Sequence, residues 1–190
     1  MLETAAHKFN FQSNISYKLQ KPYINSHKQP RILIVSMRGF QSEAFRSAEY
    51  EFEDVINTFD YADLLSPAYA SSFKSEITKK IANYAGLALN NNKLLRSGCE
   101  ELVIDKEYDL IFFICQHFWD LTCINNIKGW RDKCKNAVLW IDEIWAKELE
   151  NHKTGLCLKL AKDFDYIFTT QSQSVKAISQ LVKQIGRAHV

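Results

Sequence analysis

Apolar residues along this chain fall into short unbroken runs separated by stretches with helical spacing. The first unbroken run, Ile32–Val35, follows a long polar stretch and begins directly after Arg31. Continuous β-branched and apolar residues are typical of a strand covered on both faces, as in a parallel sheet. The chain therefore predicts a buried parallel strand at the point where order begins.

Four later segments also have the pattern of buried strands. They are residues 61–65, 110–115, 137–141 and 166–168. Two of these strands are preceded by similar four-residue segments, the aromatic-Asp leaders at residues 106–109 and 162–165. In each, a lysine comes before an aromatic residue and an aspartate. Strands that alternate with helical segments indicate repeated βαβ units. With right-handed crossovers, five such strands predict an α/β fold: a Rossmann-like open parallel sheet with helices on both faces.

Helical spacing of apolar residues marks the segments between these strands. Residues 45–59 carry apolar side chains at steps of three and four, with acidic residues between them. A second helix has one apolar face and is expected to end at the three asparagines 90–92; this face comprises Phe73, Ile77, Ile81, Tyr84 and Ala88. Further helices are predicted over residues 143–162, which include Gly155, and around residues 175–182. Such amphipathic helices normally turn their apolar stripe toward a core.

The length of 190 residues corresponds to about one domain, with enough chain to bury roughly two-thirds of its unfolded surface. Residues 1–29 are polar and show no period that would give a face to bury, so we expect a flexible N-terminal arm. Residues 30–184 are expected to form the folded domain. The last six residues, 185–190, match what one frame of a common sequencing-adapter DNA encodes before a stop codon. We expect this tail to be non-native and the natural protein to continue beyond Gln184.

Charge and composition narrow the classes of function. The chain has 24 Lys and Arg residues against 22 Asp and Glu residues, and no basic patch is interleaved with aromatics, so nucleic acid is not an expected partner. The longest apolar run falls far short of the ~20 residues of a membrane helix, and no signal peptide is evident. A cytoplasmic location is expected, with peripheral membrane contact still open. The five cysteines lack metal-ligand spacing, and we expect reduced thiols and no metal site.

Ligands of open parallel sheets bind beyond the carboxyl ends of the strands, so residues after each strand are the candidates for chemistry. After the first strand, Arg38, Gly39 and Phe40 form a turn that can face a ligand, although one glycine falls short of a dinucleotide fingerprint. The alternative is an ordinary turn with Arg38 in solvent. After the strand at 110–115, His117 can act as an acid, a base or a ligand contact, and Trp119 can stack on a sugar ring. Structural roles for both remain open.

The strand at 137–141 is followed by two neighbouring carboxylates, Asp142 and Glu143, between two tryptophans. Burial beside indole rings would raise a carboxyl pKa and suit a general base. The alternative is that Glu143 stabilises a helix N-terminus. After the last strand, Gln171 and Ser172 can hydrogen-bond a polar ligand or cap a helix.

The order of these segments and their pattern of residue types resemble the N-terminal domain of a bacterial GT-B glycosyltransferase of the family 1/family 4-like type. The segments that carry the resemblance are residues 31–41, the two aromatic-Asp strands, residues 140–145 and residues 165–172. The resemblance covers residues 30–184. It implies that this domain binds a sugar acceptor and that a missing C-terminal domain binds the nucleotide-sugar donor.

On this resemblance the parent enzyme transfers a sugar to an acceptor hydroxyl without a cofactor or metal. The proton would pass to His117, Asp142 or Glu143, and the substrate would meet Arg38 and its turn, Trp119 and the 171–172 loop. The fragment alone is expected to be inactive. The alternative is a standalone Rossmann-like or flavodoxin-like module that binds a small ligand or a protein. An exposed apolar patch where a second domain would pack favours the truncated enzyme, and a polar surface there favours the module.

Overall fold

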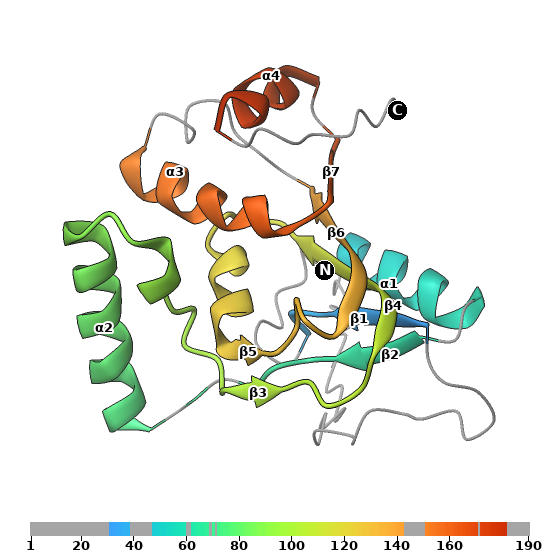
Figure 1. Cartoon of the computed structure of the whole chain (residues 1–190), viewed down its shortest axis with the longest axis horizontal. Helices are drawn as coiled ribbons and strands as arrows, with labels where there is room; N and C mark the ends of the chain where they lie inside the picture. The colour runs from blue at the N-terminus through green and yellow to red at the C-terminus, as the bar shows by residue number, and fades with distance from the viewer. Residues whose placement is uncertain are drawn as a thin grey trace, which may run out of the picture.

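The structure is a computed structural model, and it describes residues 31–38, 47–59, 62–68, 70, 72–142, 151–170 and 172–181. Its centre is an all-parallel sheet of five strands in the order β2-β1-β4-β6-β7 (Figure 1). The strands are β1 (Ile32–Val35), β2 (Ala62–Leu65), β4 (Tyr108–Cys115), β6 (Cys134–Ile141) and β7 (Tyr166–Thr169). The predicted α/β class and all five predicted strands are confirmed, and β4 and β6 begin earlier than the apolar runs indicated.

Helices cover both faces of the sheet. Helix α1 (Ser47–Phe59) lies on one side, and α2 (Phe73–Ala88) and α3 (His152–Leu158) lie on the other, as Figure 1 shows. Shorter 3-10 turns, η2 (Asn92–Leu94), η3 (Asp120–Asn126) and η5 (Lys159–Asp163), join the second layer, and α4 (Ser172–Leu181) follows β7. A small parallel sheet pairs β3 (Leu102–Val103) with β5 (Ile127–Lys128). The sequence pattern did not predict this small sheet, since its strands are only two residues long.

The main core lies between the sheet and the layer that contains α2 and α3. Alternate strand residues, such as Val35, Phe113 and Leu139, are fully buried there. The α1 side is covered less completely. Phe52 of α1 contacts the rings of Phe112 and Trp140 at centroid distances of 5.8 and 5.2 Å, and these strand aromatics are only half-buried.

The two aromatic-Asp leaders fix the amino ends of their strands. The carboxylate of Asp165 accepts a hydrogen bond from the Ala137 amide at 2.8 Å and another from Arg131 at 2.9 Å. Asp109 pairs with Arg31 at 2.7 Å and with Lys135 at 2.6 Å, and these two cations lower the pKa of the Asp109 carboxyl. The repeated motif therefore has a structural role at the edge of the sheet opposite the candidate site.

The helix predicted over residues 143–162 is shorter than expected. Residues 143–150 lie outside the described part of the chain. Asn151 has an extended backbone, and its side chain accepts a hydrogen bond from the Lys153 amide, so α3 begins only at His152. From Lys159 the helix tightens into the 3-10 turn η5. Apolar spacing alone did not reveal this cap, since an Asn within an amphipathic pattern is also compatible with a continuous helix.

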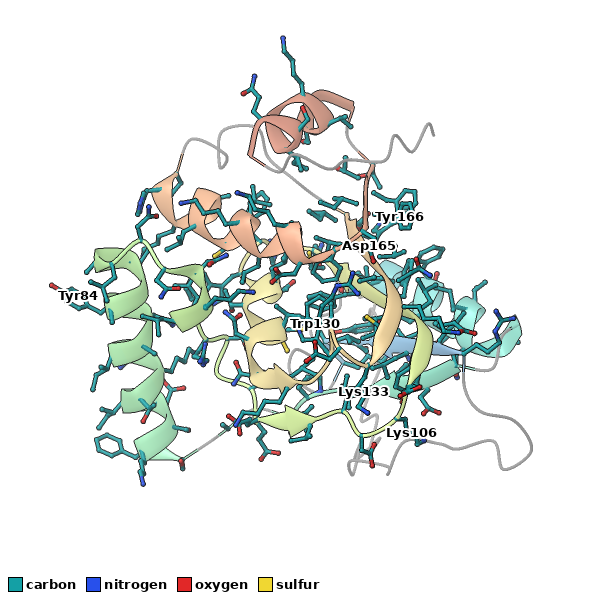
Figure 2. All side chains as sticks on the ribbon, in the orientation of Figure 1. Tyr84, Lys106, Trp130, Lys133, Asp165 and Tyr166 are labelled. Atoms are coloured by element: carbon teal, nitrogen blue, oxygen red, sulfur yellow. The ribbon has the colours of Figure 1, made fainter. Side chains whose placement is uncertain are left out.

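Helix α2 forms where it was predicted, but its apolar face points outward, contrary to expectation. Phe73, Ile81 and Tyr84 are 81%, 64% and 77% exposed, and Tyr84 is seen extending away from the protein in Figure 2. The inward side carries Asn83 and the buried Gly86. The helix ends as predicted at the asparagines, where Asn90 adopts a φ of 51°.

Candidate functional site

The candidate site lies at the carboxyl ends of the strands. Strands β1 and β4 are hydrogen-bonded neighbours, with Val35 beside Phe113, but the chain leaves them for opposite sides of the sheet. The strand order therefore changes direction between β1 and β4, which is the position where open α/β sheets bind ligands. Residues 36–38 follow β1, and residues 116–120 follow β4.

Arg38 is tied to α1 and does not project into solvent. Its side chain is only 13% exposed, its Nε donates to Glu53 Oε2 at 2.9 Å, and its Nη2 pairs with Asp54 at 2.8 Å. The guanidinium also lies 5.0 Å from the centre of the Tyr50 ring and donates to the Tyr50 carbonyl. The simple alternative with Arg38 in solvent is therefore wrong. The observed contacts assign Arg38 to holding α1 against the end of β1.

Ser36, the first residue after β1, also belongs to this network. Its hydroxyl donates to Glu53 Oε2 at 2.6 Å, and both side chains are buried. Burial raises the pKa of the Glu53 carboxyl, although the hydrogen bonds from Ser36 and Arg38 oppose the shift. Burial by itself would lower the pKa of Arg38, but the neighbouring Asp54 and Glu53 outweigh it and the pKa is raised. Glu53 could not be recognised from the sequence, because one more acidic residue in an amphipathic helix resembles a solvent-facing one.

The turn after β4 is fixed by Asp120. Its carboxylate accepts hydrogen bonds from the backbone amides of Gln116 at 3.2 Å and His117 at 3.0 Å. The side chain of Gln116 is buried, and its Oε1 has no hydrogen-bond partner within the described residues. His117, in contrast, is exposed. The Asp120 bonds thus hold the backbone of a turn that presents an imidazole outward.

His117 and Trp119, both predicted as site residues, line one open pocket with a volume of about 360 Å³. Residues from the start of α3 form its other wall. The described lining consists of His117, Phe118, Trp119, Asn151, Lys153, Thr154 and Cys157. Burial raises the pKa of the Cys157 thiol to about 12, so this cysteine is not a nucleophile at neutral pH. The pocket therefore offers a ring nitrogen, an indole face, an ammonium and a hydroxyl to a ligand.

Asp142 is not among the described residues that line this pocket. Its amide donates to the Cys115 carbonyl at 3.0 Å, and its own carbonyl accepts from the Thr170 hydroxyl. Alternation along β6 puts the Asp142 side chain on the same face as Trp140, which is the α1 side. The structure therefore does not bring Asp142 and His117 together as a pair. Glu143, Gly39, Phe40 and Gln171 lie outside the described residues, as does the side chain of Ser172, the first residue of α4.

The part of the chain that the structure describes also bears on metal binding, disulfide bonds and membrane-spanning helices. No group of three His, Cys, Asp or Glu side chains there can hold a metal ion. All five cysteines are buried, and no disulfide joins them, although the sulfurs of Cys99 and Cys123 are 3.2 Å apart. No helix among the described residues is long and apolar enough to cross a membrane.

Comparison with known proteins adds no relative. No family model matches the sequence, and neither the curated proteins nor the solved structures give a match. The geometry of the site and the sequence resemblance described above are therefore the basis for a functional proposal.

Proposed function

We propose that this chain is the acceptor-binding domain of a GT-B-type glycosyltransferase, and that the sugar acceptor binds in the pocket beside His117 and Trp119. One observation carries the proposal. His117 and Trp119, both predicted from the sequence to contact the acceptor, line the same pocket, and its opposite wall comes from the start of α3, more than thirty residues later in the chain. The pocket follows β4 at the edge where parallel sheets bind their ligands.

The lining suits a small polyhydroxylated ligand. The indole of Trp119 can stack on the apolar face of a sugar ring, and the volume of about 360 Å³ falls within the usual range for small-molecule pockets. Lys153 is exposed at the rim and Thr154 is half-buried beside it, so both can reach ligand hydroxyls. The orientation of the bound ligand would then depend on hydrogen bonds to these polar groups and on stacking of its ring against Trp119.

In the intact parent, an acceptor hydroxyl would attack the anomeric carbon of a nucleotide-activated sugar. His117 is exposed at the pocket, and a ring nitrogen of its imidazole can accept the hydroxyl proton as a general base. Asp142, whose side chain lies on the α1 face, is not a candidate for this base at the pocket, whereas Glu143 lies outside the described residues and remains the other candidate. The groups that stabilise the leaving diphosphate would come from the C-terminal donor domain. The isolated chain is therefore expected to show no transfer, and turnover of a sugar nucleotide by residues 1–184 would contradict this division of roles.

Acceptor binding is tested by saturation-transfer NMR with a panel of methyl glycosides. We expect signals from at least one glycoside with the wild-type chain, and a loss of about fivefold in affinity in Trp119→Ala if stacking contributes about 1 kcal/mol. Trp119 also packs against the core, so its truncation can affect the fold as well as binding. Lys153→Ala is therefore the second variant, because the Lys153 side chain is exposed.

His152→Ala is the matched control. His152 is exposed and neighbours Lys153, but it does not line the pocket. Glycoside signals that survive in His152→Ala and weaken in Trp119→Ala and Lys153→Ala would support the proposal. Signals that are unchanged in both pocket variants, or a wild-type chain that binds no glycoside of the panel, would overturn it.

A second candidate is a flavodoxin-like module that binds a small ligand between β1 and β4. The strand order favours this candidate. When the five strands of the main sheet are numbered in chain order, β2-β1-β4-β6-β7 becomes 2-1-3-4-5, which is the order of flavodoxin-like sheets. The buried Gln116 amide oxygen at this edge has no partner in the described structure, and a ligand could supply the missing donor. Thermal unfolding against nucleotides and flavins tests this candidate, since a bound ligand raises the unfolding temperature. A shift that is lost in Gln116→Leu would favour the module over the glycosyltransferase domain.

A further inference from the structure

The exposed stripe of α2 is the largest apolar feature on a single helix among the described residues. Four side chains at steps of four, four and three residues form it: Phe73, Ile77, Ile81 and Tyr84. They lie on one face of a 16-residue helix, which is about 24 Å long at 1.5 Å per residue. Scattered exposed apolar residues are ordinary on protein surfaces, but a continuous stripe of this size marks a contact surface.

The stripe is not needed to hold α2 on its own domain. The helix is attached through its opposite side, where Asn83 Oδ1 accepts from the Arg96 amide at 2.7 Å and Asn83 Nδ2 donates to the Arg96 carbonyl at 3.0 Å. Gly86 lies close against Leu95, so that a Cβ there would approach the leucine side chain to 2.9 Å. The apolar face is therefore available to another molecule.

The order of side chains along the stripe matches a second copy of itself. Read in either direction, the stripe runs aromatic, isoleucine, isoleucine, aromatic. When two such helices pack antiparallel about a two-fold axis, Phe73 of one copy meets Tyr84 of the other, and Ile77 meets Ile81. A two-fold interface must be complementary to itself in this way. Ridges formed by residues four apart also give the commonest helix-packing geometry.

The exposed area is sufficient for such a contact. With the exposures of the four side chains, the stripe presents roughly 550 Å² per copy, estimated from the size of aromatic and aliphatic side chains. Complete burial of this area in two copies would remove about 1,100 Å² from solvent, which is the size of a weak, transient interface. A pair of these helices therefore meets the size requirement for a weak dimer.

We propose that α2 forms a symmetric, antiparallel homodimer interface in which its aromatic–isoleucine–isoleucine–aromatic stripe packs against the same stripe of a second copy. Lys74 and Lys80 are exposed on the two flanks of the stripe. Glu76 lies four residues before Lys80 on the same flank, so in the antiparallel pair each Lys80 lies near both an ammonium group and a carboxylate of the other copy. These charges offset one another and the contact is mainly apolar, so added salt should change this dimer little, whereas it would weaken binding of an acidic protein or an anionic membrane.

Sedimentation equilibrium of the full chain measures the dimer directly. We expect dimers at about 100 µM protein, corresponding to a modest association free energy, with an affinity that changes little with NaCl concentration. In a dimer of Ile81→Asp, the new carboxylate of each copy would be buried against Ile77 of the other, so the interface would hold two buried charges. This should weaken the dimer by about thirtyfold or more. The control is Val103→Asp, which places the same charge on an equally exposed apolar residue of β3, 71% exposed, and should leave the dimer unchanged.

A charge exchange tests the register. Ile77→Lys and Ile81→Asp should each be monomeric alone, but a mixture of the two should form a heterodimer, since the Lys at 77 then meets the Asp at 81 and the second pair stays isoleucine on isoleucine. A mixture that remains monomeric while the wild-type chain dimerises would overturn the antiparallel register. A wild-type chain that is monomeric at about 100 µM would overturn the interface itself. Binding of the monomer to anionic vesicles, lost in Ile81→Asp, would likewise overturn it in favour of a membrane surface.

Discussion

Helices α2 and α3 lie in the same layer, yet they use their apolar residues in opposite ways. Helix α3 has only seven residues, and it buries the consecutive side chains of Leu156, Cys157 and Leu158. Helix α2 has sixteen residues and buries only Gly86 among those described, while its apolar stripe faces outward. An amphipathic period therefore identifies a helix, but the contacts on its other side decide which face meets the protein.

The largest difference between the two helices is expected in core truncation. Leu158 is fully buried, so Leu158→Ala should lower the free energy of unfolding by about 3 kcal/mol through lost burial and a residual cavity. The same truncation on α2, Ile81→Ala, removes an exposed side chain and should change the free energy by less than about 0.5 kcal/mol. Urea unfolding at low protein concentration measures both. Equal losses would show that the stripe of α2 is buried within its own domain.

The attachment of α2 through Asn83 gives the next largest effect. Asn83→Ala removes both bonds to Arg96 and leaves a backbone amide and a carbonyl without partners, which should cost about 2 kcal/mol. The corresponding change on α3, Asn151→Ala, removes an N-cap and should cost about 1 kcal/mol. Thermal unfolding of the two variants compares them. A neutral Asn83→Ala would mean that α2 is held by other contacts.

The two helix-interior glycines should respond with opposite signs. Adding a Cβ at Gly86 brings it to 2.9 Å from Leu95 and 3.1 Å from the Asn91 carbonyl oxygen, so Gly86→Ala should destabilise by about 1 to 2 kcal/mol despite its better helix propensity. At Gly155 a Cβ meets nothing within 4 Å, so Gly155→Ala should stabilise by about 0.5 to 1 kcal/mol. Chemical denaturation decides the signs, and a stabilising Gly86→Ala would contradict the close packing of α2.

The smallest effect concerns pH and the buried thiol of α3. The pKa of Cys157 is raised to about 12 in the folded chain, whereas an unfolded cysteine titrates near 8.5. The unfolded state therefore loses its proton first, and stability present below about pH 8.5 declines as the pH rises toward 12. Between pH 8 and 9.5 the loss should be about 1 kcal/mol, and it should be smaller in Cys157→Ala. An identical alkaline slope in that variant would contradict the assignment.

Sequence reasoning identified four of the five main strands because each contains an unbroken apolar run, a pattern that few other environments produce, whereas β2 contains Asp63 and was recognised from its short length before Ser66 and Pro67. It also placed His117 and Trp119 at the carboxyl edge of the sheet, because residues that follow a parallel strand lie there, and both line the described pocket, while their functional roles stay predictions. It missed Lys153 and Thr154, whose place in the pocket depends on how α3 packs and not on any local pattern. The role of Asp120 was equally hidden, because a backbone-binding carboxylate has no signature in a single sequence.

The position of β1 at the interior of the sheet constrains how the chain can acquire its structure during synthesis. β1 is made before its partner β4, which lies more than seventy residues later in the chain, and the ion pair between Arg31 and Asp109 forms only once both strands are present. Contacts between segments so distant in sequence slow folding, because a long loop must close before they form. Until β4 has left the ribosome, one hydrogen-bonding edge of β1 stays open, and this interval is when the nascent chain is most exposed to aggregation.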